Sequence, residues 1–154
     1  MSNINSLKSL LKEDQDNIRQ YKEGKVGLDE FSKKANIINA QFAEWLKTND
    51  IPDYQLKEEE YTAFVALLLH SGEKLMTEVL NLFFDKIRSK DRAYIIDKAR
   101  VLKNEPQIYG TQYKRIKDGK VDFLPIENPE EIDQRRGEVG LESIAEYEKK
   151  ILEL

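Results

Sequence analysis

His70 is the only histidine of the chain, and it directly follows the apolar stretch Tyr61 to Leu69. Histidine is the side chain whose ordinary pKa lies nearest neutrality, so His70 is the first candidate for a general acid or base. If the apolar stretch is a helix, a cationic imidazole at its C-terminal end is also favoured by the helix dipole. Two interpretations stay open: a catalytic proton carrier, and a helix-terminal residue bonded to its own last carbonyls.

Asp97 interrupts an otherwise apolar helical pattern, with Lys98 beside it and Arg100 three residues further on. A buried carboxylate must be paired, because an unpaired buried charge is costly. Asp97 is therefore either an acid directed at a polar pocket, where it could orient His70 catalytically, or one partner of a surface ion pair with Arg100 or Lys98.

Asp133 is followed by the adjacent arginines Arg135 and Arg136. Guanidinium groups bind carboxylates and phosphates through two parallel hydrogen bonds, so Arg135 or Arg136 could hold an anionic ligand. Asp133, like Asp97, is a candidate catalytic residue that could orient His70. The alternative is structural: salt bridges to Asp133, to Glu130 or to a neighbouring hairpin.

The segment Tyr109-Gly110-Thr111-Gln112 combines polar side chains with a glycine inside a predicted strand. A strand glycine commonly marks a bulge or the close approach of another group. Alternation along the strand places Gly110 and Gln112 on one face, with Gln112 as a buried amide, and Tyr109, Thr111 and Tyr113 on the other. Tyr109, Thr111 and Gln112 are thus candidate binding residues, or parts of a strand packed on helices.

The elements that must position these residues are mostly helical. Apolar residues at helical spacing recur over most of the chain, and Lys117-Asp118-Gly119 is a strong hairpin signal between strands at 107–116 and 120–125. The sequence predicts a single domain, residues 1–154, of the mostly α (α+β) class, with about six to seven helices and one β-hairpin near residues 107–125. The predicted helices cover residues 6–23, 31–49, 61–70, 73–88, 89–102, 129–139 and 143–154.

Start and stop signals give several of these boundaries. Asp29 and Ser89 are expected to cap helices, and Asn128-Pro129 followed by two glutamates is a good helix start. Gly140 is expected to end that helix, and Ser143 with Glu146 forms a capping box for the last one.

Composition excludes several classes of function. The chain has 154 residues, 40% of them apolar and 35% charged, with a net charge of −4 and no cysteine. Thiolate zinc sites, disulfides and cysteine nucleophiles are excluded, and one histidine cannot build a histidine-rich metal site. No phosphate-binding glycine loop or nucleophile elbow is present. A carboxylate-based magnesium or manganese site stays open, but no spaced acidic motif supports it. We expect no metal and no cofactor.

The charges also bear on partners and location. Both signs are interleaved along an acidic chain, so nucleic acid is not favoured as a partner. Met1 to Leu11 has no signal-peptide pattern, and the longest apolar run, Ala63 to Leu69, is too short for a membrane span. We expect a soluble cytoplasmic protein that binds a small molecule or another protein, in an oligomeric state that the sequence does not give.

The chain also resembles a known family from Pro106 onward. The resemblance rests on Pro106 to Gln112 with its Tyr-Gly-Thr-Gln motif, then Pro125-Ile126, Asp133 with Arg135-Arg136, and Val139-Gly140-Leu141. These segments are similar to a family of uncharacterised bacterial proteins, a domain of unknown function. The resemblance extends upstream through Phe64 to His70 and Asp97-Lys98, and covers roughly residues 40–150.

The resemblance implies a related set of residues but no reaction. That set consists of His70, Asp97, Tyr109, Thr111, Gln112, Asp133, Arg135 and Arg136. The chain departs from the family pattern at His70-Ser71-Gly72, where relatives often have His-Ala-Asp. If that acid supports the histidine in relatives, Glu73 would have to replace it here, or the site is altered.

Three hypotheses follow from these residues. In the first, the chain is an enzyme acting on a small molecule or peptide through a His/Asp/Arg pocket. In the second, it is a non-catalytic binding module, such as an adaptor or immunity-type protein, with Tyr109, Thr111 and Tyr113 as a contact patch. In the third, the polar set only ties the hairpin to the helices.

Overall fold

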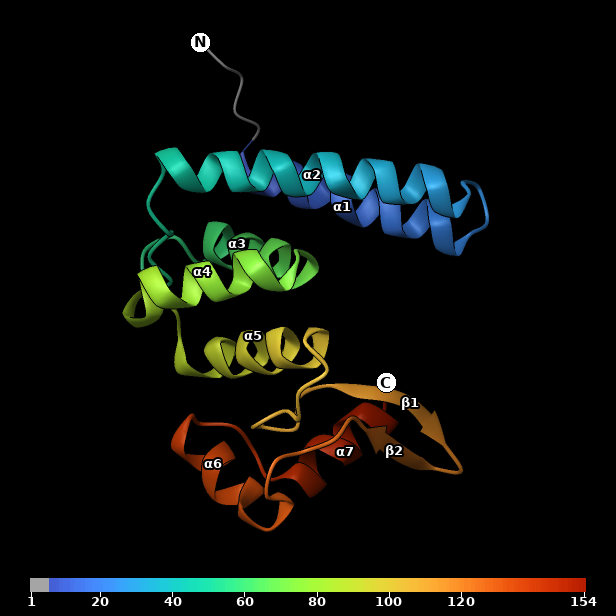
Figure 1. Ribbon diagram of the computed structural model, residues 1–154, viewed down its shortest axis with the longest axis vertical. Helices are drawn as coiled ribbons and strands as arrows, with labels where there is room; N and C mark the ends of the chain where they lie inside the picture. Colours follow the sequence, from blue (N-terminus) through green and yellow to red (C-terminus); the bar gives the residue numbers. More distant parts are fainter. Residues whose placement is uncertain (1–5) are drawn as a thin grey trace. The chain divides into compact units, whose positions relative to one another are not determined.

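Seven α-helices and one antiparallel two-stranded hairpin form the part of the chain that the computed structural model describes, residues 6–154 (Figure 1). The predicted mostly helical class with one hairpin is confirmed. Contacts divide the chain into two compact units, one that ends at Ser71 and one from Gly72 to Leu154. The single domain stays a prediction, and the signal-peptide expectation falls partly on residues 1–5, outside the described part.

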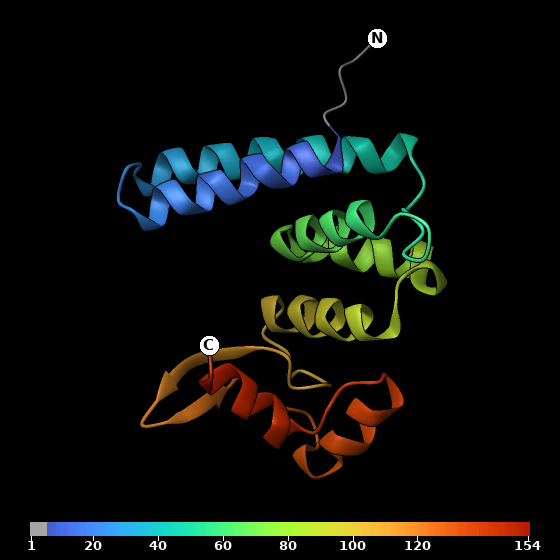
Figure 2. The ribbon, with the colours of Figure 1, turned by 180° about the vertical axis from the view of Figure 1, so that it is seen from behind.

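The first unit contains three helices: α1 (Leu7–Lys22), α2 (Leu28–Thr48) and α3 (Glu58–His70). α1 and α2 lie side by side and antiparallel in both ribbon views (Figure 1, Figure 2). α3 packs on α1 and is apolar on nearly every side, with Tyr61 and Phe64 fully buried. The prediction that Asp29 caps α2 is wrong, because the helix begins at Leu28 and its cap is Gly27.

The second unit contains four α-helices and two short 3₁₀ helices. They are α4 (Glu73–Phe83), η1 (Phe84–Lys86), α5 (Ser89–Leu102), η2 (Pro129–Glu131), α6 (Ile132–Glu138) and α7 (Ile144–Leu152). The predicted helix 73–88 is interrupted at η1, where Arg92 donates to the carbonyl oxygens of Phe84 and Ile87. The capping box of Ser143 and Glu146 at α7 is confirmed.

The hairpin pairs β1 (Tyr113–Lys117) with β2 (Lys120–Phe123). Asp118 and Gly119 both have positive φ, 51° and 71°, as a tight two-residue hairpin turn requires. The predicted first strand is wrong before Tyr113, because residues 107–112 form a loop rather than a ladder. β2 packs against α7, where the Val121 N–H donates to the Glu148 carboxylate at 2.9 Å.

No helix within residues 6–154 is long and apolar enough to cross a membrane.

Candidate functional site

His70 is the last residue of α3, and its imidazole contacts a buried acid of the same unit. Its Nδ1 lies 2.5 Å from Oδ2 of Asp14, whose side chain is only 7% exposed, whereas the His70 side chain is 44% exposed. When Nδ1 carries the proton that this bond shares, Nε2 is the unprotonated nitrogen and can accept a proton. A histidine oriented in this way by a carboxylate has the arrangement of a general base.

Asp14 is brought to His70 by the buried face of α1. Leu7 and Leu10 begin that face, and Asp14 and Asn17 continue it at helical spacing, all four being buried. The Asn17 side chain donates to the Phe31 carbonyl oxygen of α2 at 3.0 Å. Asp14 was not among the predicted site residues, although two polar residues on an apolar stripe were a usable signal.

Glu73 was one of two alternatives left open for the missing family aspartate, the other being an altered site. Its carboxylate instead lies 3.8 Å from the Lys103 ammonium within the second unit. The observed side-chain partner of His70 is Asp14, and neither Asp97 nor Asp133 belongs to that unit.

Asp97 is fully buried in α5, and its carboxylate accepts four hydrogen bonds from the 107–112 loop. Oδ1 accepts from the Ile108 N–H at 2.8 Å and the Tyr109 N–H at 3.0 Å. Oδ2 accepts from the Thr111 N–H at 2.9 Å and the Thr111 hydroxyl at 2.8 Å. The expected surface pair with Arg100 or Lys98 is therefore wrong. This carboxylate holds a loop that lacks regular backbone pairing.

Arg136 is also fully buried, and it holds the same loop from the other side. Its Nε donates to the Glu142 carbonyl oxygen at 2.6 Å and its Nη1 to the Tyr109 carbonyl oxygen at 2.7 Å. The guanidinium carbon lies 4.8 Å from the centroid of the Tyr147 ring, a favourable cation–π distance. The Tyr109 N–H thus donates to the Asp97 carboxylate, and the Tyr109 carbonyl oxygen accepts from the Arg136 guanidinium. One residue therefore connects the two buried charges.

Gln107, rather than Gln112, is the buried amide. Its Nε2 donates to the carbonyl oxygens of Gln112 at 2.8 Å and Leu124 at 2.9 Å, and its Oε1 accepts from the Gln112 N–H. The Gln112 side chain is half-buried and donates to the Thr111 hydroxyl at 3.1 Å. The prediction for Gln112 failed because the parity of a strand does not apply to a loop.

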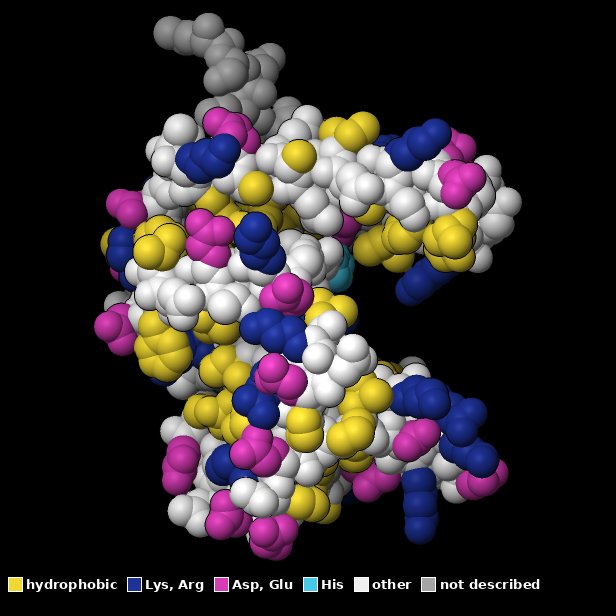
Figure 3. Space-filling view, viewed as in Figure 1, with side chains coloured by type: hydrophobic (Ala, Val, Ile, Leu, Met, Phe, Trp, Pro, Cys, Tyr) yellow, Lys and Arg dark blue, Asp and Glu magenta, His cyan; other side chains and the backbone are white. Residues whose placement is uncertain are grey.

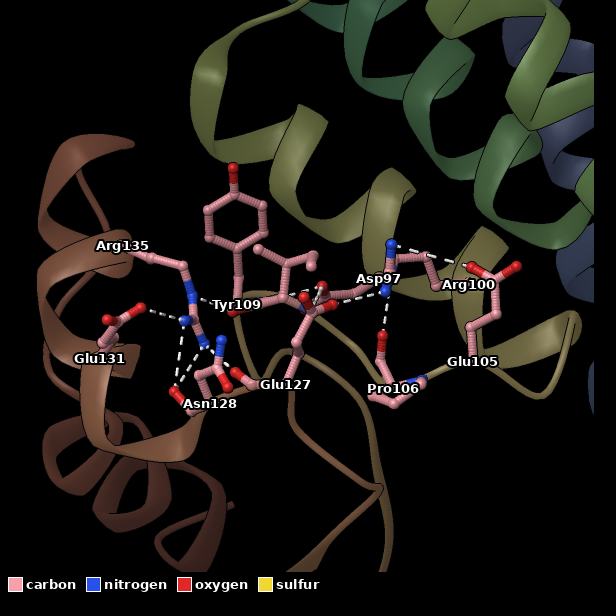
Figure 4. A network of polar contacts seen from close by, with 10 residues as sticks. Asp97, Arg100, Glu105, Pro106, Tyr109, Glu127, Asn128, Glu131 and Arg135 are labelled. Carbon is pink, nitrogen blue, oxygen red and sulfur yellow. Dashed lines mark hydrogen bonds and ion pairs between the residues drawn. The ribbon is translucent and has the colours of Figure 1, made fainter.

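Two further arginines fasten the segments beside this loop (Figure 4). The Arg135 guanidinium donates to the carbonyl oxygens of Ile108, Glu127 and Asn128. Arg100 donates to the Pro106 carbonyl oxygen at 2.6 Å and to the Glu127 carboxylate at 2.7 Å. Both guanidiniums therefore bind carbonyl oxygens of the protein itself.

Asp133 accepts a hydrogen bond from the Ile144 N–H at 2.8 Å, so it joins α6 to the first turn of α7. A salt bridge to Asp133 was one of the structural alternatives for the two arginines, but the Arg136 guanidinium donates to carbonyl oxygens instead.

Within the second unit, the structure gathers the predicted residues from Asp97 to Arg136 around the 107–112 loop, and His70 belongs to the first unit. Thr111 is 3% exposed, so Tyr109, Thr111 and Tyr113 do not form the expected exposed patch. Within residues 6–154, no group of three or more histidine, aspartate or glutamate side chains could hold a metal ion.

The loop also requires a glycine at residue 110, where φ is +65°. A Cβ there would lie 2.9 Å from Ile144 Cδ1 and 3.2 Å from Ile126 Cδ1. We expect Gly110→Ala to lower the free energy of unfolding by about 2 kcal/mol in a urea titration, from backbone strain and overpacking. Gly137→Ala is the matched control, because nothing lies within 4 Å and helix α6 favours alanine. Equal effects of the two substitutions would contradict the explanation.

Tyr147 makes the stability of the second unit sensitive to alkaline pH. Its hydroxyl donates to the Thr111 carbonyl oxygen at 3.0 Å. Burial, followed by the hydrogen bond with Tyr94, raises the pKa of the Tyr147 phenol well above its ordinary value. The stabilisation by the neutral phenol is complete below the unfolded-state pKa, about 10, and is lost as pH rises above it towards the folded-state value.

Tyr147→Phe should therefore flatten this alkaline loss. At pH 7 we expect it to cost about 1 kcal/mol, because the buried Thr111 carbonyl loses its donor. Urea titrations from about pH 8 to 11 would measure both effects, and an alkaline slope that the substitution leaves unchanged would refute the assignment.

Comparison with known proteins gives one match. The model of a family of unknown function (DUF6624) matches residues 36–153 of the chain. No curated protein and no solved structure matches the chain. The matched range includes His70 and the whole polar set around the 107–112 loop, and it begins after Asp14.

Proposed function

The chain belongs to this family of unknown function, DUF6624, and we propose that it is an enzyme acting on a small molecule or peptide through His70. The single observation that carries the proposal is the short contact between the half-exposed imidazole and the buried Asp14 carboxylate. His70 is the catalytic residue, and Asp14 is the residue that positions it.

The division of exposure between the two side chains supports this assignment. A carboxylate that is 7% exposed fixes the ring through Nδ1, while a ring that is 44% exposed leaves Nε2 able to meet a substrate. The position of His70 at the C-terminal end of α3 adds the negative end of the helix dipole, which stabilises the imidazolium formed after proton transfer.

The polar set of the second unit has a different role in this proposal. The carboxylate of Asp97 and the guanidiniums of Arg135 and Arg136 are bonded to the chain's own main chain. They maintain the loop and give shape to the unit, as the architectural hypothesis expects, and Asp14 takes the orienting role first assigned to Asp97 or Asp133.

The test is a screen of chromogenic carboxylic esters, phosphate esters and anilides, followed by variants. His70→Gln should lower kcat about a hundredfold or more, and Asp14→Asn about tenfold or more, for the substrate that is turned over. Asp16→Asn is the control, because Asp16 pairs with Arg19 at the surface of the same helix. Activity unchanged in His70→Gln would overturn the proposal.

A second readout does not need the substrate. Because His70 is the only histidine, ¹⁵N spectra of labelled protein report its two ring nitrogens without ambiguity. We expect Nδ1 to carry the proton in the neutral form and Asp14→Asn to change the tautomer populations. An Nε2–H tautomer in the unmodified protein would exclude His70 Nε2 as the base.

A binding module is the second candidate, and the hairpin favours it. All five residues of β1 are exposed, and Figure 3 shows Lys and Arg side chains gathered over the hairpin. The basic residues are Lys114, Arg115, Lys117 and Lys120. An acidic protein surface is the partner they fit. Replacement of Lys114, Lys117 and Lys120 by glutamate should release that partner, whereas His70→Gln should retain it.

The cytoplasm of a bacterium is the setting in which we place either function, since the chain has no cysteine.

A further inference from the structure

A pocket of about 470 Å³ lies within the first unit, at the C-terminal end of α2. This volume is in the range that small ligands occupy. Its walls combine apolar residues, Trp45, Pro52 and Leu56, with acidic ones. We propose that this pocket binds a primary ammonium group carried on an apolar stem, a site separate from His70 and independent of the function proposed above.

The charge of the lining favours a cation. Asp50, Asp53 and Glu60 line the pocket, and Lys57 is the basic residue among its lining residues. The α2 helix ends at Thr48 beside the pocket, so the negative end of its dipole adds to the carboxylates. The positive ends of α1 and α3 are offset locally, by the Ser6 side chain that caps α1 and by the glutamates Glu58 to Glu60 in the first turn of α3.

The apolar walls favour a stem behind the charge. Trp45 is half-buried, Pro52 is buried, and Leu56 is 83% exposed at the rim. Tryptophan is the aromatic side chain that attracts cations best, and it also packs against methylene groups. A lysine side chain of a peptide and a free alkylamine share this chemistry.

The turn that carries Asp53 is held by hydrogen bonds to the Asp53 side chain itself. Asp53 Oδ1 accepts from the Gln55 N–H at 2.7 Å and the Leu56 N–H at 3.3 Å. These hydrogen bonds fix Asp53 relative to Leu56, and both residues line the pocket.

Lys57 is the internal competitor of the ligand, since it is the lysine among the lining residues. Removing that charge while keeping a long apolar side chain, as in Lys57→Met, should therefore strengthen binding.

The test uses Trp45, the single tryptophan of the chain, as a fluorescent reporter. We expect n-butylamine to change its emission saturably, with a Kd on the order of millimolar, and n-butanol to bind at least about fivefold more weakly. Nα-acetyl-lysine methylamide distinguishes the two sources: tighter binding than n-butylamine indicates a peptide lysine, and weaker binding a free amine.

Substitutions of charged residues test whether the charge of the pocket is responsible for the binding of n-butylamine. Glu60→Gln should weaken n-butylamine binding about fivefold and Lys57→Met should tighten it, whereas Glu44→Gln, on α2 outside the pocket, should leave it unchanged. The proposal is overturned by an emission that n-butylamine does not change saturably, by equal affinities for n-butanol and n-butylamine, or by a Glu60→Gln variant that binds like the unmodified protein. His70→Gln should bind normally, which separates this site from the proposed activity.

Discussion

Asp97→Asn is expected to lower the free energy of unfolding by about 4 kcal/mol, which is the largest loss we expect from a single substitution in this chain. The carboxylate accepts four hydrogen bonds and is fully buried. An asparagine of the same size keeps one acceptor oxygen and directs an N–H₂ group at main-chain donors. The buried N–H groups of the loop would then be unsatisfied.

Guanidinium titration followed by circular dichroism would measure this loss. The control is Asp122→Asn, an exposed carboxylate 3.4 Å from Arg115, whose removal should change stability by less than about 0.5 kcal/mol. Asp97→Ala offers a further check, because the vacated donors should bind formate. Formate should raise the stability of that variant and leave the unmodified protein unaffected. An Asp97→Asn variant as stable as the control would show that the loop holds without the carboxylate.

Arg136→Lys is the second large effect, at about 3 kcal/mol, although the charge is conserved. The guanidinium reaches the carbonyl oxygens of Glu142 and Tyr109 at once and stacks on Tyr147. A lysine ammonium is compact and not planar, so it cannot reproduce this geometry. One carbonyl oxygen would remain buried without its donor.

The comparison variant is Arg115→Lys, where the arginine is exposed and the expected change is near zero. A double-mutant cycle of Asp97→Asn and Arg136→Lys then tests the connection through Tyr109. We expect the two losses to be non-additive by about 1 kcal/mol or more, because both substitutions release the same loop. Strict additivity would mean that the two charges act separately.

Helices and the hairpin turn could be predicted because their signals are local. A dense apolar stretch indicated α3, the Ser143 capping box placed the start of α7, and Asp118-Gly119 gave the turn. The strand before Tyr113 was predicted wrongly because a buried carboxylate fourteen residues away competes for the backbone donors of Thr111. Alternating residue types contain no information on such a distant partner.

The sequence identified several residues of the candidate site but not the groups to which they are hydrogen-bonded. Asp97 and Arg136 were identified as unusual charges, and both are fully buried. Apart from the bond between Asp97 and the Thr111 hydroxyl, their hydrogen bonds go to main-chain groups, which every residue offers, so side-chain identity could not indicate these partners. Asp14 was missed because it lies fifty-six residues from His70, and only packing of α1 on α3 brings the two together.

The hydrogen bonds to Asp97 also determine how slowly the amide hydrogens of the loop exchange with solvent. The amide hydrogens of Ile108, Tyr109 and Thr111 lie in a loop, and loop amides ordinarily exchange with solvent deuterium within seconds to minutes. Here each is bonded to a buried carboxylate, so exchange requires the loop to open and break these hydrogen bonds. We expect these three amides to exchange as slowly as those in the centre of α5, and faster by orders of magnitude in Asp97→Asn. By the criterion of hydrogen exchange, this loop belongs to the slowest-opening core of its unit.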